Sequence, residues 1–269
     1  MDSLFHIKGI VVITGAIGLM GKHHTRAVLE NKGSVALIDI DMQKLEDFKS
    51  ILKSEGYNEV YIYSCDITDK KNVEVVLDDL LKKDMPIVGL INNAAINPTV
   101  TENLQNDSAL ENYNFSTWNE EINVGIKGAL ICSIVFGACM AKNGYGSIIN
   151  ISSDLGLIAP DHRLYKNDKN GIQQYKPVSY SIIKHALIGL TKYLSTYWNE
   201  SGVRSNTLLP GGIKDNQSNE FLDKIENLIP LGRMANPDEY KGAIVFLLSD
   251  SSSYMTGANL IIDGGRSAW

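Results

Sequence analysis

The feature that most constrains the fold is a glycine-rich turn between an apolar segment and an amphipathic one near the start of the chain. Residues Ile10–Ile13 form a short apolar run, and the sequence Thr14-Gly-Ala-Ile-Gly-Leu-Met-Gly21 joins them to an amphipathic stretch over Leu19–Asn31. Glycines at 15, 18 and 21 let the backbone turn tightly and approach a pyrophosphate at the N-terminus of a helix. The pattern predicts a strand–turn–helix unit that binds a dinucleotide, with Gly15, Gly18, Leu19 and Met20 at the phosphates.

Strands and helices are predicted to alternate through the first half of the chain. Further strands are expected at Ser34–Asp39, Val60–Ser64 and Ile87–Ile91, and further helices at Met42–Glu55 and Lys70–Lys83. Gly33 is expected to cap the first helix, and Asp41 and Asp69 to begin the next two. This order predicts an α/β fold whose parallel strands are joined by right-handed helical crossovers.

The second half contains one helix that is more apolar than the others. A capping box at Thr117–Glu120 is expected to begin it, and residues 128–139 are almost wholly apolar. Because an outer helix of a sheet should keep one polar face, this helix is expected to be covered on both sides, by another subunit or by the core of a large domain. The remaining elements are strands Ser147–Ser152, Val203–Leu208 and Asn259–Ile262, a helix over Ser179–Trp198, and a late helix that begins with Asn236 and Pro237.

Composition limits the kind of partner. A net charge of -6 argues against nucleic acid or an anionic membrane surface. Cys65, Cys132 and Cys139 lack metal-ligand spacing, so we expect free thiols in a reducing compartment and no metal site. No export signal is recognised, and no apolar run approaches the ~18 residues of a membrane span. With no repeat or linker, the chain is predicted to be one cytoplasmic domain over residues 1–269.

Two long segments without a regular pattern follow the carboxyl ends of strands, where ligands bind in open α/β sheets. They cover Asn97–Phe115 and Asp154–Pro177, and segments this long are usually functional or disordered.

Asp39 also ends a strand, eighteen residues after Gly21. An acid there can bind both ribose hydroxyls of NAD and would repel the 2′-phosphate of NADP, so NAD is favoured. The alternative is that Asp39 only stabilises a turn at the end of the strand.

The sequence Tyr180-Ser-Ile-Ile-Lys184 places a phenol and an ammonium group on one face of a helix. A free tyrosine has a pKa of about 10, and a partly desolvated lysine together with a positive nicotinamide ring could lower it toward neutral pH, where the group becomes a useful acid–base catalyst. Ser153, at the end of the preceding strand, has a hydroxyl that can polarise a carbonyl or orient an alcohol. Each pattern alone is also typical of a surface or a turn, and it is their order along the chain that favours a catalytic site.

Taken together, these residues resemble the short-chain dehydrogenase/reductase family over the whole chain. The matching motifs are the glycine loop, Asp66, Asn92-Asn-Ala-Ala95, Ser153, Tyr180 with Lys184, Pro210-Gly211 and Asp263-Gly-Gly265. The resemblance implies one doubly wound Rossmann-type domain with a seven-stranded parallel sheet. It also implies a homotetramer or homodimer whose interface includes the helix near Thr117 and the helix that carries Tyr180.

The resemblance also implies a role for each matching residue. Ser153 would bind the reacting oxygen, Tyr180 would exchange its proton, and Lys184 would hold the nicotinamide ribose and lower the pKa of Tyr180. Cofactor contacts would come from Asp66, Ile67, Asn93, Ala94, Pro210, Gly211 and the backbone of Ile213. A hydride would pass between the nicotinamide and a carbon that bears a hydroxyl or carbonyl group.

Four features depart from the family pattern. The glycines have the spacing of the family's longer sugar-nucleotide branch. Gly125 stands where a catalytic asparagine is usual, and Asp215 stands where a threonine is common. Ser153 and Tyr180 are 27 residues apart (180 − 153), about twice the usual interval.

The inserted residues between Ser153 and Tyr180 suggest the kind of substrate. Long polar side chains suit a hydroxylated or phosphorylated ligand better than a steroid, although a solvated loop would have the same composition. These residues are Arg163, Lys166, Lys169, Gln173, Gln174 and Lys176. With the Gly18-Leu-Met-Gly-Lys22 loop, Gly125 and the Gly264-to-Trp269 end, the chain resembles the flagellin modification protein A subgroup, which implies a sugar or amino-sugar intermediate of surface glycan synthesis.

Two other functions stay open at this point. Gly125 and Asp215 are compatible with a nucleotide-sensing protein that kept the fold and lost turnover. The glycine spacing is compatible with an epimerase or dehydratase that retains its NAD.

Overall fold

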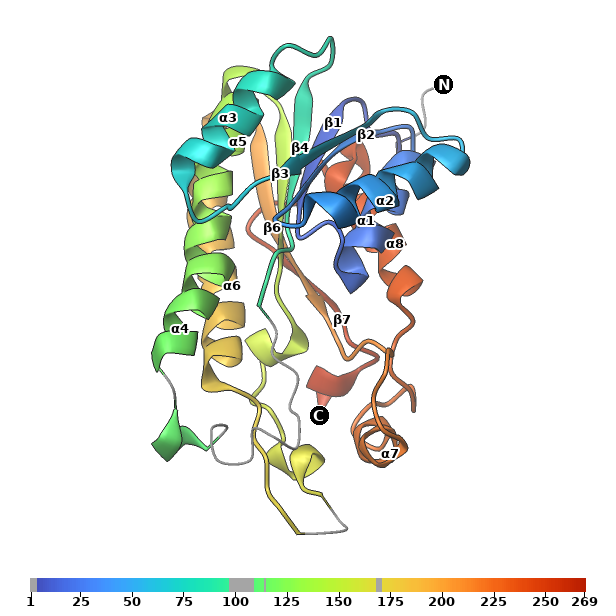
Figure 1. The fold of residues 1–269 in the computed structure, drawn as a ribbon, viewed down its shortest axis with the longest axis vertical. Helices are drawn as coiled ribbons and strands as arrows, with labels where there is room; N and C mark the ends of the chain where they lie inside the picture. Colours follow the sequence, from blue (N-terminus) through green and yellow to red (C-terminus); the bar gives the residue numbers. More distant parts are fainter. Residues whose placement is uncertain (1–3, 97–108, 114, 168–170) are drawn as a thin grey trace.

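The described residues form seven strands, which lie in one parallel sheet in the order β3-β2-β1-β4-β5-β6-β7 (Figure 1). The computed structural model describes residues 4–96, 109–113, 115–167 and 171–269. The strands are β1 (Ile10–Thr14), β2 (Ser34–Asp39), β3 (Val60–Ser64), β4 (Ile87–Asn92), β5 (Gly146–Ile151), β6 (Val203–Pro210) and β7 (Asn259–Ile262). This confirms the predicted Rossmann-type sheet, strand for strand.

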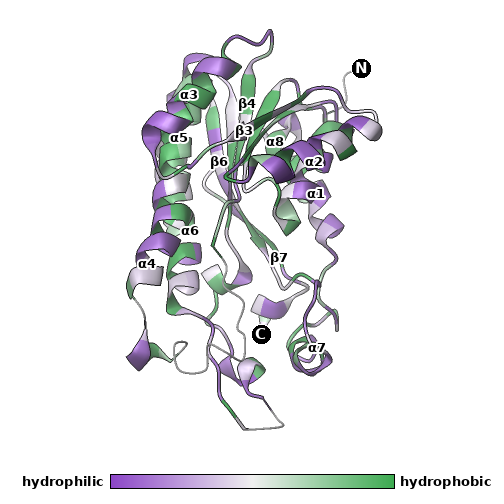
Figure 2. Cartoon of the chain, in the orientation of Figure 1, coloured by the Kyte–Doolittle hydropathy of each residue, from purple (hydrophilic) through white to green (hydrophobic). Residues whose placement is uncertain are grey.

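Helices cover both faces of the sheet, with α1, α2 and α8 on one face and α3, α5 and α6 on the other (Figure 1). Their bounds are α1 (Leu19–Glu30), α2 (Met42–Ser54), α3 (Lys70–Leu80), α4 (Phe115–Ile122), α5 (Ala129–Lys142), α6 (Val178–Tyr197), α7 (Asn219–Glu226) and α8 (Lys241–Leu248). In Figure 2, α2 and α3 carry both hydrophilic and hydrophobic residues. They bury one face each, α2 through Phe48 and α3 through Val76, because their other face meets solvent.

The predicted capping box of the apolar helix is wrong. The helix already begins at Phe115, so Thr117 lies inside α4 and does not cap it. A short π-helix, η3 (Asn123–Gly128), joins α4 to α5 without a break. The late helix does begin as predicted: Asn236 and Glu239 form a capping box with Pro237 between them, and the 3-10 turn η7 (Pro237–Tyr240) leads into α8.

The expectation of no membrane-length apolar helix also needs correction. Together α4, η3 and α5 make one helix, Phe115–Lys142, of 28 residues, and its most apolar window has a mean hydropathy of 1.9. By length and composition alone it is apolar enough to cross a membrane, and 61% of that window is buried within the fold. Its packing on β4 and β5 therefore accounts for its composition, as for the core helix of a soluble protein.

The first helix ends differently from the prediction. The left-handed residue after α1 is Lys32, with φ of 66°, and Gly33 has no positive φ. Gly33 is required for space, because a Cβ there would lie 2.6 Å from Cγ1 of Val28 and 2.9 Å from Cγ2 of Ile7. The glycine therefore allows the close packing of α1 against the start of the chain, and it is not the helix cap.

The sheet order places an opening at the carboxyl ends of β1 and β4. The chain leaves β1 toward β2 on one side and returns from β3 to β4 on the other, so the crossovers diverge between β1 and β4. In open α/β sheets such a reversal forms a ligand-binding crevice.

The segment 154–177, at the same edge, is more regular than predicted. It holds two 3-10 turns, η4 (Asp154–Gly156) and η5 (His162–Tyr165), and an antiparallel bridge between Lys166 and Gln173. Most of segment 97–115 lies outside the described residues.

Candidate active site

A cavity of about 610 Å³ lies at the carboxyl ends of β1, β2 and β4. Its volume is within the range of small-molecule sites. It is lined by Gly15, Ile17, Gly18, Leu19, Met20, Lys22, Asp39, Lys44, Asn93, Ala94 and Ala95. Seven of the predicted cofactor residues are therefore together, and the sequence reasoning missed Ile17, Lys22, Lys44 and Ala95. The missed residues are chain neighbours of predicted ones, except for the two lysines, which reach the cavity from helices.

The glycine turn has the close backbone approach that a pyrophosphate cradle needs. Gly15 has φ of 62°, and a Cβ there would lie 2.8 Å from Cα of Ala94. A Cβ at Gly21 would lie 2.3 Å from the carbonyl oxygen of Gly15. Gly18 is the N-cap of α1, and no side chain caps the first turn of that helix. The backbone amides at this helix end therefore suit an anionic group such as a pyrophosphate, so the cavity fits a dinucleotide.

Asp39 ends β2 at the edge of the same cavity. Its Oδ2 accepts a hydrogen bond from the amide of Ile17 at 3.4 Å, and its Oδ1 accepts one from the amide of Ile40 at 2.8 Å. The neighbouring Lys44 forms its ion pair with Asp41, at 2.9 Å. A carboxylate held at the cavity edge by two amides is compatible both with the turn role and with binding of ribose hydroxyls.

Asn93 joins the ends of β1 and β4 beneath the cavity. Its Nδ2 donates to the carbonyl oxygens of Thr14 and Gly15, both at 3.0 Å. The Thr14 hydroxyl in turn accepts from the amides of Asn93 and Ala94, both at 3.1 Å. These four bonds fix the floor of the cavity, so Asn93 and Ala94 shape the predicted cofactor channel through the backbone.

Asp66 and Ile67, predicted to flank the adenine, do not line the cavity. The Asp66 carboxylate accepts from the amide and the hydroxyl of Thr68, at 2.9 and 2.8 Å. Ile67 is buried in the core, where a Cβ at Gly128 would lie 2.6 Å from its Cδ1. In the described structure the Asp66 side chain stabilises the turn after β3, and the Ile67 side chain packs against η3.

Pro210, Gly211 and Ile213 lie at the end of β6, also outside the cavity. A Cβ at Gly211 would lie 2.7 Å from Cα of Asp263, so this glycine is required by the close pairing with the chain after β7. Ile213 forms a parallel bridge with Ala235, and its carbonyl accepts from Nε2 of Gln217 at 2.9 Å. These contacts hold the segment that follows β6. The predicted cofactor-binding role of the three residues, with the backbone of Ile213 at the carboxamide, stays a prediction.

Ser153, Tyr180 and Lys184 come together at the end of β5, as predicted. The hydroxyl group of Ser153 interacts with that of Tyr180 and lowers the pKa of the phenol. Nζ of Lys184 lies 5.5 Å from the centroid of the Tyr180 ring and donates to the carbonyl oxygen of Ile151 at 2.9 Å. Ser152 ties this helix to the strand by donating to the Lys184 carbonyl at 2.7 Å. The arrangement joins a hydroxyl, a phenol and an ammonium group in one buried cluster.

Burial has the largest effect on the charge state of Tyr180. Burial raises the pKa of Tyr180, and the charge of Asp154 raises it further, whereas the hydrogen bond with Ser153 lowers it. Burial lowers the pKa of Lys184 to about 8, and the charge of Lys176 acts in the same direction. Without the positive nicotinamide ring, the pKa of Tyr180 is therefore raised, because loss of hydration is the largest effect on it. The lowering expected from Lys184 together with the nicotinamide stays a prediction.

Of the predicted polar insertion, Lys176 is the residue that the structure shows at the catalytic cluster. Its Nζ lies 4.1 Å from the centroid of the Tyr180 ring, and burial lowers its pKa to about 8. Arg163 instead pairs with Asp161 at 2.6 Å, and Gln173 donates to the carbonyl of His162. The side chain of Lys169 lies outside the described residues.

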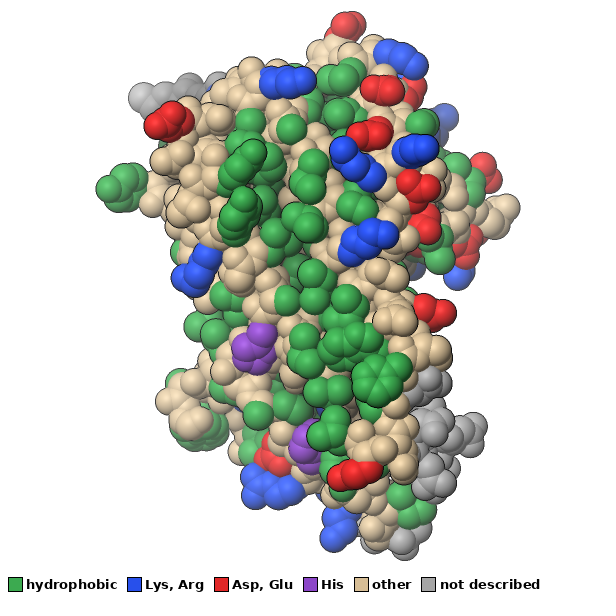
Figure 3. Space-filling view, turned by 90° about the vertical axis from the view of Figure 1, so that its left-hand side faces the viewer, with side chains coloured by type: hydrophobic (Ala, Val, Ile, Leu, Met, Phe, Trp, Pro, Cys, Tyr) green, Lys and Arg blue, Asp and Glu red, His purple; other side chains and the backbone are tan. Residues whose placement is uncertain are grey.

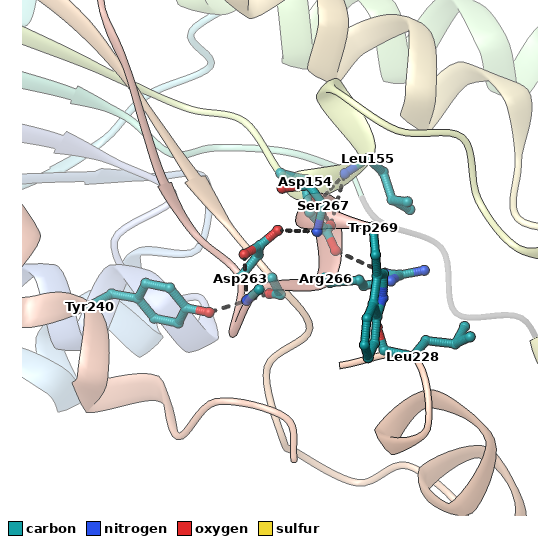
Figure 4. A network of polar contacts seen from close by, with 11 residues as sticks. Asp154, Leu155, Leu228, Tyr240, Asp263, Arg266, Ser267 and Trp269 are labelled. Atoms are coloured by element: carbon teal, nitrogen blue, oxygen red, sulfur yellow. Dashed lines mark hydrogen bonds and ion pairs between the residues drawn. The ribbon is translucent and has the colours of Figure 1, made fainter. Parts of the chain in front are cut away.

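The cluster has a buried ion pair behind it that the sequence reasoning missed. Nη1 of Arg266 lies 2.8 Å from Oδ2 of Asp154, and their side chains are 8% and 3% exposed (Figure 4). Ser153 donates to the other oxygen of Asp154, Oδ1, at 2.7 Å. The available signal was the position of Asp154 directly after Ser153, but its partner is 112 residues away in the chain.

Gly125, at the position of the usual asparagine, lies inside η3 against α6. A Cβ there would lie 2.7 Å from Cγ2 of Ile183. Any larger side chain would displace Ile183, which is buried next to Lys184 in the sequence. Packing between η3 and α6 thus explains why a glycine stands here.

Comparison with known proteins was consistent with this site. Residues 15–267 match the family model described as enoyl-(acyl carrier protein) reductase. The chain is 32% identical to post-translational flagellin modification protein A of Campylobacter coli, over 95% of this chain and 97% of that protein. It is 29% identical to NAD-dependent glycerol dehydrogenase of Listeria innocua, over 98% and 96%.

Among solved structures, a short-chain dehydrogenase from Leptospira borgpetersenii with bound NAD+ is 28% identical and superimposes with a TM-score of 0.82, covering 99% of this chain and 96% of that one. The family match extends over nearly the whole chain, and the fold agrees along its full length. The chain belongs to the short-chain dehydrogenase/reductase family of oxidoreductases.

Proposed function

We propose that this oxidoreductase uses NAD to oxidise a secondary alcohol of a sugar-like substrate, or to reduce the corresponding ketone. The observation that carries the proposal is the cluster of Ser153, Tyr180 and Lys184 at the same edge of the sheet as the glycine-lined cavity. The cavity would hold the dinucleotide through the amides at the start of α1, and Asp39 would bind the ribose hydroxyls. When bound, the nicotinamide supplies the hydride acceptor or donor.

Tyr180 is the group that would move the proton. In alcohol oxidation its phenolate takes the proton of the substrate hydroxyl, and in ketone reduction its phenol donates the proton. Ser153, which interacts with Tyr180, fixes the position of the reacting oxygen. Lys184 supplies a buried positive charge one helical turn away, which favours the phenolate once the proton has left.

Two observations support a polar, hydroxylated substrate. Lys176 brings a cation from the inserted segment to the Tyr180 ring, where a steroid or acyl chain would gain nothing from it. The relatives above include a dehydrogenase of glycerol, a small polyol. The similarity to flagellin modification protein A further supports an intermediate of surface glycan synthesis as the physiological substrate.

The proposal is tested by following nicotinamide absorbance with polyols, hexoses, amino sugars, sugar phosphates, acyl thioesters and steroids. Tyr180→Phe is expected to lower kcat at least about 100-fold, since it removes the acid–base group, while the NAD dissociation constant stays within about twofold. Tyr61→Phe, which removes a surface hydroxyl bonded to Glu59, is the matched control and should leave kcat unchanged. Near-normal turnover by Tyr180→Phe, or turnover confined to steroids and thioesters, would contradict the proposal.

Asp39 is expected to set the preference for NAD over NADP. Asp39→Ala removes an acceptor for the ribose hydroxyls and a charge that repels a 2′-phosphate, so kcat/KM should fall about tenfold for NAD and rise for NADP. Asp41→Ala is the control, because Asp41 caps α2 and pairs with Lys44. It should lower stability without altering the ratio of the two cofactors, and an unchanged ratio in Asp39→Ala would argue against the assignment.

Lys176 is expected to bind an anionic or strongly polar group of the substrate. Lys176→Met should raise KM for a sugar phosphate or sugar acid about tenfold, with a smaller effect on a neutral polyol. Because Lys176 has a pKa of about 8 and is charged below it, KM of the wild-type enzyme for the anionic substrate should rise as pH increases through that value. Arg163→Met, in the same segment, is the control, and equal effects of both variants would show a general disturbance of the segment.

We further propose that two copies of the chain associate through α5 and α6. The exposed side of these helices is apolar and aromatic, with hydrophobic side chains gathered along the middle of this face (Figure 3). The exposed residues include Leu130, Ile134, Ile182, Tyr193 and Tyr197. Such a patch on a helix pair is typical of an interface between subunits.

Light scattering coupled to size exclusion should give a mass at least twice that of the 29.6 kDa chain. Ile134→Glu with Ile182→Glu should reduce the mass to that of a smaller species, because a buried charge opposes association. Val75→Glu, at an exposed position on α3 outside this face, should not. A wild-type monomer would refute the interface.

A further inference from the structure

Ser153 has a single hydroxyl proton, and two oxygens compete for it. Its Oγ donates to Oδ1 of Asp154 at 2.7 Å, and it also interacts with the hydroxyl of Tyr180. The amide of Leu155 donates to the same Oγ at 3.2 Å. If Ser153 donated its proton to Tyr180 instead, that bond would lower the pKa of the phenol. With its proton on Asp154, the serine oxygen can only accept, so a bond with Tyr180 has the phenol as its donor. This arrangement fits the protonated form of Tyr180 and is poorly suited to the phenolate.

Asp154 is held in place by its other contacts. Nη1 of Arg266 lies 2.8 Å from Oδ2, and the amide of Leu155 donates to Oδ1 at 2.8 Å. Arg266 is itself fixed by the turn around it, where Asp263 accepts from the amides of Gly265 and Ser267 at 2.9 and 2.7 Å (Figure 4). A buried side chain with these partners keeps its geometry.

We propose that Asp154 and Arg266 are positioning residues of the active site: the carboxylate, anchored by the guanidinium, takes the proton of Ser153 and so turns the serine lone pairs toward Tyr180. Ser153 then receives the phenol proton in the resting enzyme. To bond the phenolate, Ser153 must turn its proton from Asp154 to Tyr180, which leaves the buried carboxylate with one donor fewer. The pair therefore stabilises the phenol over the phenolate.

Several other charged or titratable groups face this cluster, and their effects must be separated from that of Asp154. Lys176 and Lys184 lie on or near the Tyr180 ring. Tyr165, from η5, interacts with Tyr180, Asp154 and Arg266, and Tyr240, from η7, interacts with Asp154 and Asp263. Glu121, from α4, acts on Lys176. The variants at Asp154 and Arg266 leave all of these side chains in place, so their own contacts with Tyr180 are common to every titration that is compared.

The test is a pH titration of Tyr180 in the intact protein, with tyrosine labelled by carbon-13 at Cζ and the Tyr180 resonance identified by its loss in Tyr180→Phe. Asp154→Asn should lower the pKa of Tyr180 by about one unit, because it removes a negative charge and frees the serine proton. Arg266→Met should raise it, because the carboxylate is left uncompensated. The double variant Asp154→Asn with Arg266→Met, which buries no unpaired charge, should lower it by less than Asp154→Asn alone.

Shifts of the Tyr180 pKa in opposite directions in the two single variants cannot come from loosened packing, because loosened packing would shift this pKa in the same direction in both. Asp161→Asn, which removes the carboxylate of the exposed pair with Arg163, is the matched control and should leave the pKa of Tyr180 unchanged. An unchanged or raised pKa in both Asp154→Asn and the double variant would overturn the proposal. The idea rests on the proposed role of Tyr180, but the titration needs no substrate, so a protein without sugar turnover could still show these shifts.

Discussion

The parallel pairing of β1 with both β2 and β4 is the constraint on which the site depends. It brings the glycine turn after β1, Asp39 after β2 and Asn93 after β4 to one edge of the sheet. The backbones of Gly15 and Ala94 approach so closely that residue 15 has no room for a Cβ. Extending the same order through β5 and β6 places Ser153 beside this edge, where α6 adds Tyr180 and Lys184.

A chain of buried polar side chains keeps this edge aligned with the helices above it. Nδ2 of Asn92, on β4, donates to Asn150 on β5 and to Ser133 on α5, at 2.8 and 3.0 Å. Asn150 continues to Thr191 on α6 at 2.8 Å, and Thr207 on β6 donates to Thr191 at 2.7 Å. Because unsatisfied polar groups in a core are costly, these bonds fix the register of α5 and α6 on the sheet. The position of the catalytic helix is thus specified by bonds well below the site.

The sequence allowed the sheet, seven of the residues that line the cavity and the grouping of Ser153, Tyr180 and Lys184 to be predicted because these depend on local signals. Glycine spacing, hydrophobic period and strand-end polar residues are all readable within a few residues. The predicted capping box at Thr117 was wrong because the helix already begins at Phe115. Gly33 was wrongly predicted to cap α1, because a glycine can be required either by a positive φ or by lack of space for a Cβ, and here it is required by lack of space. The Asp154–Arg266 pair could not be found, since nothing local connects residues so far apart. The raised pKa of Tyr180 in the protein without its cofactor was not foreseen, because its main cause is burial, which the sequence does not give.

We infer that hydride passes directly between a hydroxylated carbon of the substrate and the nicotinamide, while Tyr180 moves the proton. A polyol deuterated at its carbinol carbon, incubated with NAD, tests this when the label is located by NMR. Deuterium is expected at C4 of the nicotinamide ring, and the transfer should be lost in Tyr180→Phe while NAD still binds. Reduced cofactor that carries solvent hydrogen, or label transfer that survives in Tyr180→Phe, would contradict it.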